Sequence, residues 1–341
     1  MYVVLCIAAF AVVLLAAGVL YQLLGSRRDR RLYAGSGRWV TIENGAKLYL
    51  FEIGYGEPTV LFESGISATN LNWRHVQETI AQHTGTVSYD RCGLGWSSHC
   101  RTARTPGNIA AELHQMLHRA GLKPPYILVG HSFGGLVMRR FALLYPREVA
   151  GVVLVDPMRC EEWPPLDPAK QSQLDLGRKL IRYALPVAGC GLTRLLVSLL
   201  FCRAGNLTDQ VAGATGTDSR HVLGRIKTEV RKMPRAVWPA VAAHWSRPGF
   251  YAGIRSHLAS IPDTVTEMDA AQPIPAIPVT VLTPGNAEPL SDRDLKHIGD
   301  CVTQVIASKS AHWIHLDEPA LVIDSIRSLI AAPISESLAV N

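Results

Sequence analysis

The fold of this chain is decided by the stretch Gly130-His131-Ser132-Phe133-Gly134, which joins two regular elements. Residues 126–129 before it form an apolar run typical of a buried strand, and residues 136–144 after it follow a helical pattern. A serine in such a strand-to-helix turn exposes its hydroxyl, and the flanking glycines let strand and helix pass closely. The N–H groups at the start of the helix, including that of Phe133, point at any oxygen bound beside the serine. The stretch therefore predicts that Ser132 is a nucleophile.

The composition indicates a folded protein with a sizeable core. Of the 341 residues, 48% are hydrophobic and 18% are charged, which excludes a disordered chain. The formal net charge is +6, but the basic residues are dispersed and accompany no nucleic-acid-binding motif. We therefore expect no nucleic-acid partner, and we attribute the basic surface to proximity to an anionic membrane.

The N-terminal segment has the length and polarity of a membrane span. Residues 3–24 carry no charge and are dominated by Val, Leu and Ala. A helix of this length spans about 33 Å, which is the thickness of a bilayer core. The arginines at 27, 28, 30 and 31 follow the segment instead of preceding it, unlike the charges of a cleaved signal peptide. The sequence predicts a single-pass transmembrane anchor at 1–25 and a basic linker at 26–38. By the positive-inside rule, it also predicts that the bulk of the chain lies on the cytoplasmic side, with the N-terminus outside.

The remaining chain alternates between strand and helix patterns. Two strands, at 39–42 and 47–53, are joined by Asn44-Gly45, a strong hairpin signal. The expected buried strands lie at 59–62, 86–89, 126–129, 152–155, 278–282 and 302–306, and a last helix at 319–330. This alternation predicts an α/β fold with a mostly parallel sheet and helices on both faces.

Residues 157–272 interrupt this alternation. They contain no clear strand but helical stretches such as 171–185 and 192–201. We expect a helical cap of about four helices, inserted into a core formed by 39–156 and 273–332. The leucines at 192, 195, 196, 199 and 200 share one helical face, which fits packing inside the cap, acyl-chain binding or membrane contact. The proline-rich residues 272–278 are expected to be a stiff connector back into the sheet.

A serine nucleophile needs a base within hydrogen-bond reach, and the base needs an orienting carboxylate. Of the twelve histidines, His312 is best placed as the base, because it lies between the last strand and the terminal helix. His312 and His315 have the spacing of half a metal site, but no third ligand stands near them, and His315 is expected to start a helix. The seven cysteines lack C-x-x-C spacing. No metal site or disulfide framework is predicted.

Two further motifs identify the family that this chain resembles. Residues 89–97 read Tyr-Asp-Arg-Cys-Gly-Leu-Gly-Trp-Ser, and residues 311–319 hold His312 ahead of Asp-Glu-Pro. With the turn at Ser132, they match the D-x-x-G-x-G-x-S loop and the histidine loop of a serine member of the α/β-hydrolase superfamily, of the esterase or lipase kind. The resemblance runs from about Trp39 to Ile330 and implies no cofactor. It also implies two oxyanion donors, the N–H of Phe133 and that of Ile66 in the loop after the third strand.

The carboxylate of the triad has several candidates. The commonest family position lies after the strand before the histidine strand, where this chain has Glu288. The other family position is the end of the preceding strand, where Asp156 follows an apolar run. Asp156 also has a simpler interpretation, as a strand-end cap before a proline. We rank Asp156 first, Glu288 second and Asp292 third.

These expectations together predict a membrane-anchored serine hydrolase that cleaves a carboxylic ester, either a small molecule or a lipid-like apolar acyl ester. Dehalogenases and epoxide hydrolases of this family use an aspartate in the turn, so Ser132 argues against both. Acyl transfer on the same fold and a pseudo-hydrolase that binds without turnover stay as alternatives. Asp90 and Arg91 are expected to fix their loop through hydrogen bonds or a buried ion pair. The sequence identifies no protein partner.

Overall fold

The computed structural model describes residues 1–160, 168–201 and 230–332. The chain divides into two compact units. The first comprises Met1–Ser36 and Pro168–Arg255, and the second comprises Gly37–Asp167 and Ser256–Asn341. Parts of the predicted cap, at 161–167 and 202–229, lie outside the described residues, as do residues 333–341.

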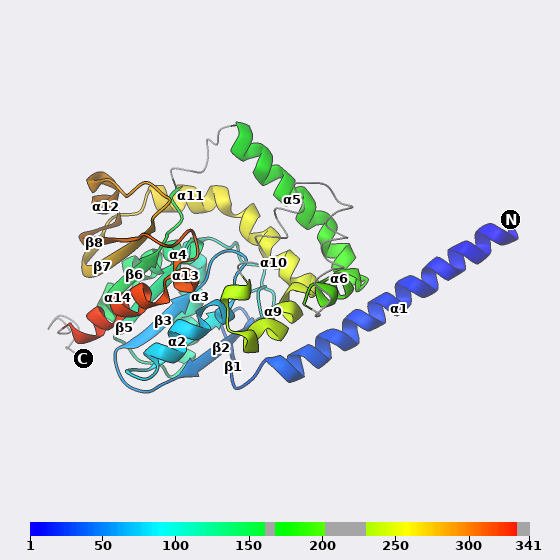
Figure 1. Ribbon diagram of the computed structural model, residues 1–341, viewed down its shortest axis with the longest axis horizontal. Coiled ribbons are helices and arrows are strands. Elements are labelled where there is room, and N and C mark those ends of the chain that lie inside the picture. The colour runs from blue at the N-terminus through cyan, green and yellow to red at the C-terminus, as the bar shows by residue number, and fades with distance from the viewer. Residues whose placement is uncertain (161–167, 202–229, 333–341) are drawn as a thin grey trace. The chain divides into compact units, whose positions relative to one another are not determined.

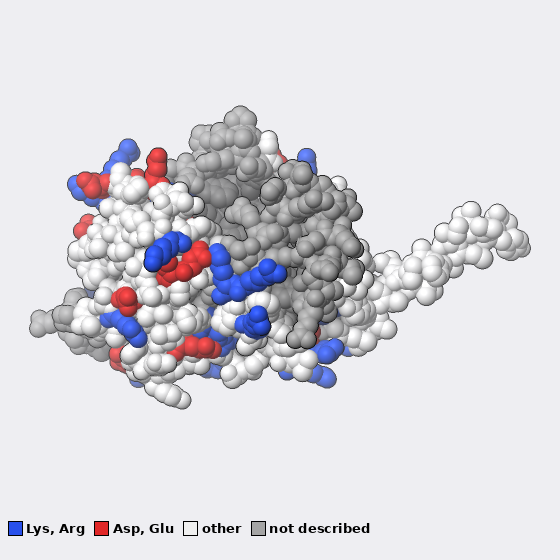
Figure 2. All heavy atoms as spheres, viewed as in Figure 1, with Lys and Arg blue, Asp and Glu red and all other residues white. Residues whose placement is uncertain are grey.

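The first unit is helical (Figure 1). It contains α1 (Tyr2–Tyr33), α5 (Pro168–Gly189), α6 (Leu192–Phe201), η4 (Arg235–Val237), α9 (Trp238–Trp245) and most of α10 (Pro248–Ala259). The two helices expected near residues 171–185 and 192–201 are therefore present. α1 runs on through most of the predicted linker, because residues 26–33 contain no helix breaker and several good helix formers. Figure 2 shows that the N-terminal part of α1 carries no charged side chains.

The second unit is built on one eight-stranded sheet with the order β1-β2-β4-β3-β5-β6-β7-β8. The strands are β1 (Arg38–Thr41), β2 (Lys47–Ile53), β3 (Thr59–Glu63), β4 (Thr86–Asp90), β5 (Tyr126–His131), β6 (Val149–Val155), β7 (Ile274–Pro284) and β8 (Gly299–Ala307). β2 is antiparallel to β1 and β4, and the other neighbours are parallel. The predicted hairpin and the mostly parallel sheet are confirmed.

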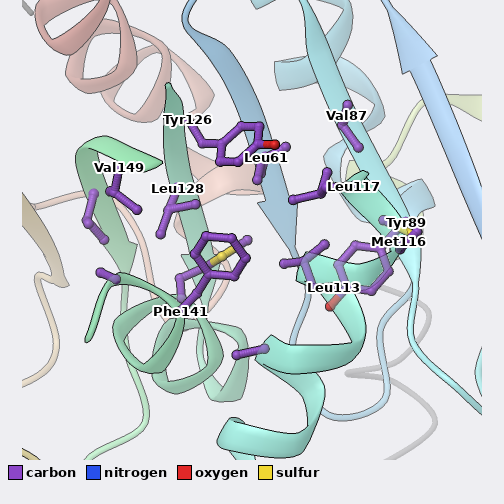
Figure 3. Close-up of a cluster of buried hydrophobic side chains, with 14 of the residues drawn as sticks. Leu61, Val87, Tyr89, Leu113, Met116, Leu117, Tyr126, Leu128, Phe141 and Val149 are labelled. Carbon is purple, nitrogen blue, oxygen red and sulfur yellow. The ribbon is translucent and has the colours of Figure 1, made fainter. Parts of the chain in front are cut away.

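Helices cover both faces of this sheet, as predicted. The covering helices are α2 (Arg74–Ile80), α3 (Pro106–Ala120), α4 (Phe133–Leu144) and α14 (Pro319–Ala331). Leu61 and Leu128 pack with side chains of α3 and α4 on one face (Figure 3), and Val60 and Ile127 pack with those of α2 and α14 on the other. Neighbouring strand residues point to opposite faces, so a strand buried on both sides must be apolar almost throughout. This explains the continuous apolar runs in the sequence.

Short elements connect the larger ones. They are η1 (Asn70–Trp73), η2 (Pro146–Glu148), α11 (Ile261–Asp269), α12 (Asp292–Ile298) and α13 (Ile314–Asp317). The expectation of a connector at 272–278 is wrong in one respect, because β7 already begins at Ile274, which pairs with Gly299 of β8. The pairing is irregular between Ile274 and Pro278. Proline suits an extended backbone but has no N–H for the ladder, which accounts for both facts.

Candidate active site

Ser132 lies in a strained turn between β5 and α4. Its φ and ψ are 53° and −122°, values that a residue other than glycine rarely adopts. The N–H of Ser132 donates to the carbonyl of Val155 at 3.0 Å, and the Ser132 carbonyl accepts from Gly135 at 2.9 Å and Met158 at 3.1 Å. These backbone hydrogen bonds hold the strained conformation in place.

The glycines around Ser132 are required by close backbone contacts. A Cβ on Gly130 would lie 2.5 Å from the carbonyl oxygen of Gly134. A Cβ on Gly134 would lie 2.6 Å from the carbonyl oxygen of Glu63 at the end of β3. No side chain larger than hydrogen fits at either position without moving backbone.

Asp156 is the carboxylate that the structure brings to His312. Its Oδ2 lies 2.7 Å from Nδ1 of His312, and the two side chains are 19% and 46% exposed. Asp156 follows β6 directly, and its N–H donates to the Leu282 carbonyl of β7 at 2.8 Å. With Nδ1–H donated to the carboxylate, the lone pair of His312 is on Nε2.

The two alternative acids occupy other surroundings. Glu288 is exposed, and its backbone carbonyl accepts a hydrogen bond from Nη2 of Arg159 at 2.6 Å. Asp292 is exposed at the start of α12. Within the described part of the chain, the carboxylate bonded to Nδ1 of His312 is that of Asp156.

Two buried histidines support the loop that carries His312. Nε2 of His131, next to Ser132, donates to the carbonyl of His312 at 2.8 Å. Burial, then the neighbouring His315 and His312, holds the pKa of His131 well below its usual value. His315 lies in α13 with its ring 4.5 Å from the Trp73 ring, and mainly burial lowers its pKa to about 3. Both rings are therefore neutral, and they fix the position of the loop by packing and one hydrogen bond.

Arg91 contacts the residues expected to supply the oxyanion donors. Its Nη2 donates to the carbonyl of Gly65, and its guanidinium carbon lies 5.2 Å from the centroid of the Phe133 ring. The Gly65–Ile66 peptide is trans, so fixing its carbonyl also fixes the opposite direction of the Ile66 N–H. A Cβ on Gly65 would lie 3.6 Å from Cβ of Ser132, which shows that this loop runs beside Ser132.

A buried charged cluster holds Arg91. Nε of Arg91 lies 3.4 Å from Oε1 of Glu63, and the hydroxyl of Tyr89 donates to Oε2 of the same carboxylate. Burial raises the pKa of Glu63, and the Arg91 cation and the Tyr89 hydroxyl oppose that rise. Asp90 accepts hydrogen bonds from the N–H groups of Asn70 at 3.0 Å and Trp96 at 2.9 Å. The sequence predicted that Asp90 and Arg91 fix their own loop, but it assigned no role to Glu63. The position of this carboxylate at the end of an apolar strand could have drawn attention to it.

Two groups of side chains have the composition of metal ligands. Cys92, Cys100 and Glu112 lie close together, but Nη1 of Arg104 is already 2.9 Å from Oε1 of Glu112 and 3.0 Å from Sγ of Cys100. A guanidinium thus occupies the place of a cation there. The second group is His114, His118 and Glu148, at the surface of α3 and η2.

The sequence matches the family model described as alpha/beta hydrolase fold over residues 58–191. An AB hydrolase superfamily protein of Gibberella zeae is 35% identical over 98 residues, which cover 28% of this chain and 30% of that protein. The uncharacterized protein YqjL of Bacillus subtilis is 34% identical over 99 residues, which cover 29% of this chain and 39% of YqjL. The chain thus spans less than half the length of these two curated relatives.

Solved structures resemble the chain over most of its length. The epoxide hydrolase CorEH has a TM-score of 0.63 at 18% identity, covering 87% of this chain and 98% of CorEH. Cfl2 from Burkholderia cenocepacia has a TM-score of 0.62 at 17% identity, covering 86% of this chain and 94% of Cfl2. At these identities the likeness concerns the fold alone. The family match over residues 58–191 and the strand order agree with this likeness, and together they show that the chain has the α/β-hydrolase fold.

Proposed function

We propose that this α/β hydrolase cleaves a carboxylic ester through Ser132, His312 and Asp156. The observation that carries the proposal is the 2.7 Å contact between Oδ2 of Asp156 and Nδ1 of His312, on a loop bonded to the residue next to Ser132. A strained serine, a histidine and a carboxylate in this relation form the triad that activates a hydroxyl for acyl transfer.

The reaction has two steps. Nε2 of His312 takes the proton of Ser132 as Oγ bonds to the ester carbonyl carbon, and the N–H groups of Phe133 and Ile66 hold the resulting oxyanion. The bond to the leaving alkoxide then breaks as His312 returns the proton to it, which releases an alcohol and leaves the acyl group on Ser132. Water attacks this acyl group while giving a proton to His312. The carboxylic acid leaves as Ser132 regains its proton.

The substrate class follows from the proposed nucleophile. Although CorEH is named an epoxide hydrolase, the serine at position 132 favours an acyl-enzyme and hence an ester, either a small molecule or an apolar, lipid-like one.

α1 is the described helix that is long and apolar enough to cross a membrane, and the side chains of its apolar stretch are not buried. We propose that α1 is an uncleaved anchor and that the arginines after the apolar stretch keep the hydrolase on the cytoplasmic side.

A fluorophosphonate probe, which reacts with activated serines, tests the chemistry. The full-length wild type should be labelled and should hydrolyse p-nitrophenyl butyrate, and Ser132→Ala should lose labelling and at least about 10³-fold of the rate. A wild type that is neither labelled nor active would favour the pseudo-hydrolase. Transfer of the butyryl group to an added alcohol in preference to water would favour an acyltransferase. Retention of the full-length chain in membranes after a carbonate wash tests the anchor separately.

A further inference from the structure

The corner between α5 and α6 touches the apolar part of α1, within the first unit. A Cβ on Gly18 of α1 would lie 2.2 Å from the carbonyl oxygen of Cys190, and one on Gly191 would lie 2.6 Å from the carbonyl oxygen of Gly18. These distances require direct contact between the backbones. The corner residues therefore lie level with Gly18 along α1.

The contact continues along α1 through a buried arginine of α6. Nε of Arg194 lies 3.0 Å from Oε1 of Gln22, and Nη1 lies 2.5 Å from Oδ2 of Asp29. Nη2 of Arg194 lies 3.3 Å from Oγ of Ser26. The polar groups of this contact thus bond to one another, as groups near a hydrocarbon phase must. Gly191 thus meets the apolar part of α1, and the side chain of Arg194 reaches Asp29 nearer its basic end.

This register sets the depth of the corner. Gly18 precedes Leu24, the last residue of the apolar stretch, by a distance of about 9 Å along the helix axis. We propose that the α5–α6 corner is embedded in the bilayer that α1 crosses, so that the ends of α5 and α6 at this corner lie within the membrane. This inference depends on the proposed role of α1 as an anchor.

The exposed side chains of both helices fit a lipid surface. Leu192, Leu195 and Leu196 are exposed on α6. Among the described side chains of α5, the exposed large apolar ones are Leu176, Leu180 and Tyr183, whose spacing places them on one helical face. The exposed cations Lys179 and Arg182 stand next to that face, where anionic headgroups would meet them. Apolar residues with flanking cations are typical of helices that lie in a membrane interface.

Photocrosslinking from three positions of the full-length chain tests the proposal. p-Benzoylphenylalanine is placed at Leu195 of α6, at Leu14 of α1 and at Leu144 of α4, all exposed. Each protein is reconstituted in phosphatidylcholine vesicles with phosphatidylglycerol and irradiated, and lipid adducts are measured by mass spectrometry of the peptides. We expect adducts from positions 14 and 195 and at least tenfold fewer from position 144.

The outcomes separate the inference from the anchor and from the enzyme activity. Lipid adducts at 14 without adducts at 195 would leave the anchor intact and overturn the embedded corner. A crosslink from 195 to a second protein chain would also overturn it. Absence of adducts at both positions would overturn the anchor and the corner together. Ester hydrolysis by the same preparations reports on the proposed triad independently.

The group His114, His118 and Glu148 carries a second inference, from different observations. Nε2 of His114 lies 3.0 Å from Nε2 of His118 and 3.0 Å from Oε1 of Glu148, and Nε2 of His118 lies 3.7 Å from the same oxygen. No placement of protons turns both 3.0 Å contacts into separate two-centre hydrogen bonds. The reason is that Nε2 of His114 can either donate one proton or accept one, but not both.

A divalent cation removes this conflict. Ligand atoms of a tetrahedral zinc ion are separated by about 3.4 Å, close to the three separations found here. The His114 ring stacks on Tyr145 at 3.7 Å, which fixes its direction, and Oε2 of Glu148 is buried without a hydrogen-bond partner among the described residues. The geometry points to a zinc-type site formed by His114, His118 and Glu148, with further positions open to solvent.

Zinc chloride alone is the probe for this site. Tag-free full-length protein, stripped with EDTA, should bind one equivalent in calorimetric titration and unfold at a higher temperature with zinc. His118→Ala and Glu148→Gln should each weaken binding at least tenfold, whereas His75→Ala, at an exposed histidine elsewhere, should not. Equal binding by the wild type and His118→Ala, or absence of binding by the wild type, would overturn the inference.

Discussion

Ser132 and Asp156 stand at equivalent positions of neighbouring strands. They follow His131 and Val155, which are paired in register across β5 and β6, and both have a positive φ, 53° and 42°. Among the described residues other than glycine, only these two have a positive φ. The proposed nucleophile and the proposed acid thus leave the sheet side by side, and the surrounding ladder sustains the strain at both.

This pairing predicts opposite results for the two candidate acids. Asp156→Asn removes the negative charge that selects the Nδ1–H tautomer of His312 and stabilises its protonated form. We expect kcat for p-nitrophenyl butyrate to fall by about 10³-fold to 10⁴-fold. Glu288→Gln is the matched control, because it neutralises an exposed carboxylate, and it should change kcat by less than about twofold. The reverse order of effects would transfer the role of acid to Glu288, and equal moderate losses would redirect attention to Asp292.

The turn glycines predict a stability effect that depends on position. Gly134→Ala places a Cβ 2.6 Å and 2.7 Å from the carbonyl oxygens of Glu63 and Ser64, so backbone must move. We expect a loss of about 2–4 kcal/mol in the free energy of unfolding, measured by urea titration. Gly177→Ala, inside α5 with open space at its Cβ, should instead be neutral or slightly stabilising. Equal destabilisation of both variants would show that the contacts at Gly134 are not the cause.

The contacts of Arg91 predict an effect on kcat that is separate from its effect on the stability of the fold. Arg91→Lys removes the fork that reaches both Glu63 and the Gly65 carbonyl, so the Ile66 N–H loses its fixed direction. We expect kcat to fall by up to about 10²-fold, the effect of one oxyanion donor, with little change in KM.

Arg104→Lys is the control for Arg91, because Arg104 forms a similarly buried pair with Glu112 and contacts neither Gly65 nor Phe133 in the hydrogen bonds described. It should lower stability without lowering kcat. A loss of kcat of the same size in both variants would mean that Arg91 acts only through the stability of the fold.

His315 predicts acid sensitivity of the folded state. Its pKa is about 3 when buried, against about 6.5 in the unfolded chain, so the unfolded chain binds more protons below about pH 6.5. The contribution of His315 to the free energy of unfolding should be fully present above that pH and should be lost toward pH 3. The loss for this one residue should be about 2 kcal/mol between pH 7 and pH 5. His315→Gln should reduce this loss in urea titrations, although the wild-type loss also contains His131. The control His75→Gln, at an exposed position, should leave the pH dependence unchanged.

The sequence predicted much of the fold because apolar alternation reports burial directly. The strands, the hairpin and the turn at Ser132 depend on local patterns, so each was readable residue by residue. The sequence ranked Asp156 first among the acids but left Glu288 and Asp292 open, because the distance from Asp156 to His312 depends on how β6 and the loop after β8 come together. The contacts of Glu63, Arg91 and Gly65 depend in the same way on three separate segments. Part of the proposed zinc site could be seen in the sequence, because His114 and His118 lie one helical turn apart. Glu148 comes close to them only in the folded chain.

The ion pair between Arg194 and Asp29 has a consequence for the proposed role of the N-terminal helix as an anchor. A leader peptide is disposable, since nothing in the mature domain relies on it. Here the guanidinium of Arg194 is buried against Gln22, Ser26 and Asp29, so a chain shortened past residue 29 would leave a cation enclosed without its carboxylate. Soluble versions of this protein should therefore be made by redesigning the apolar surface of α1, not by deleting the helix.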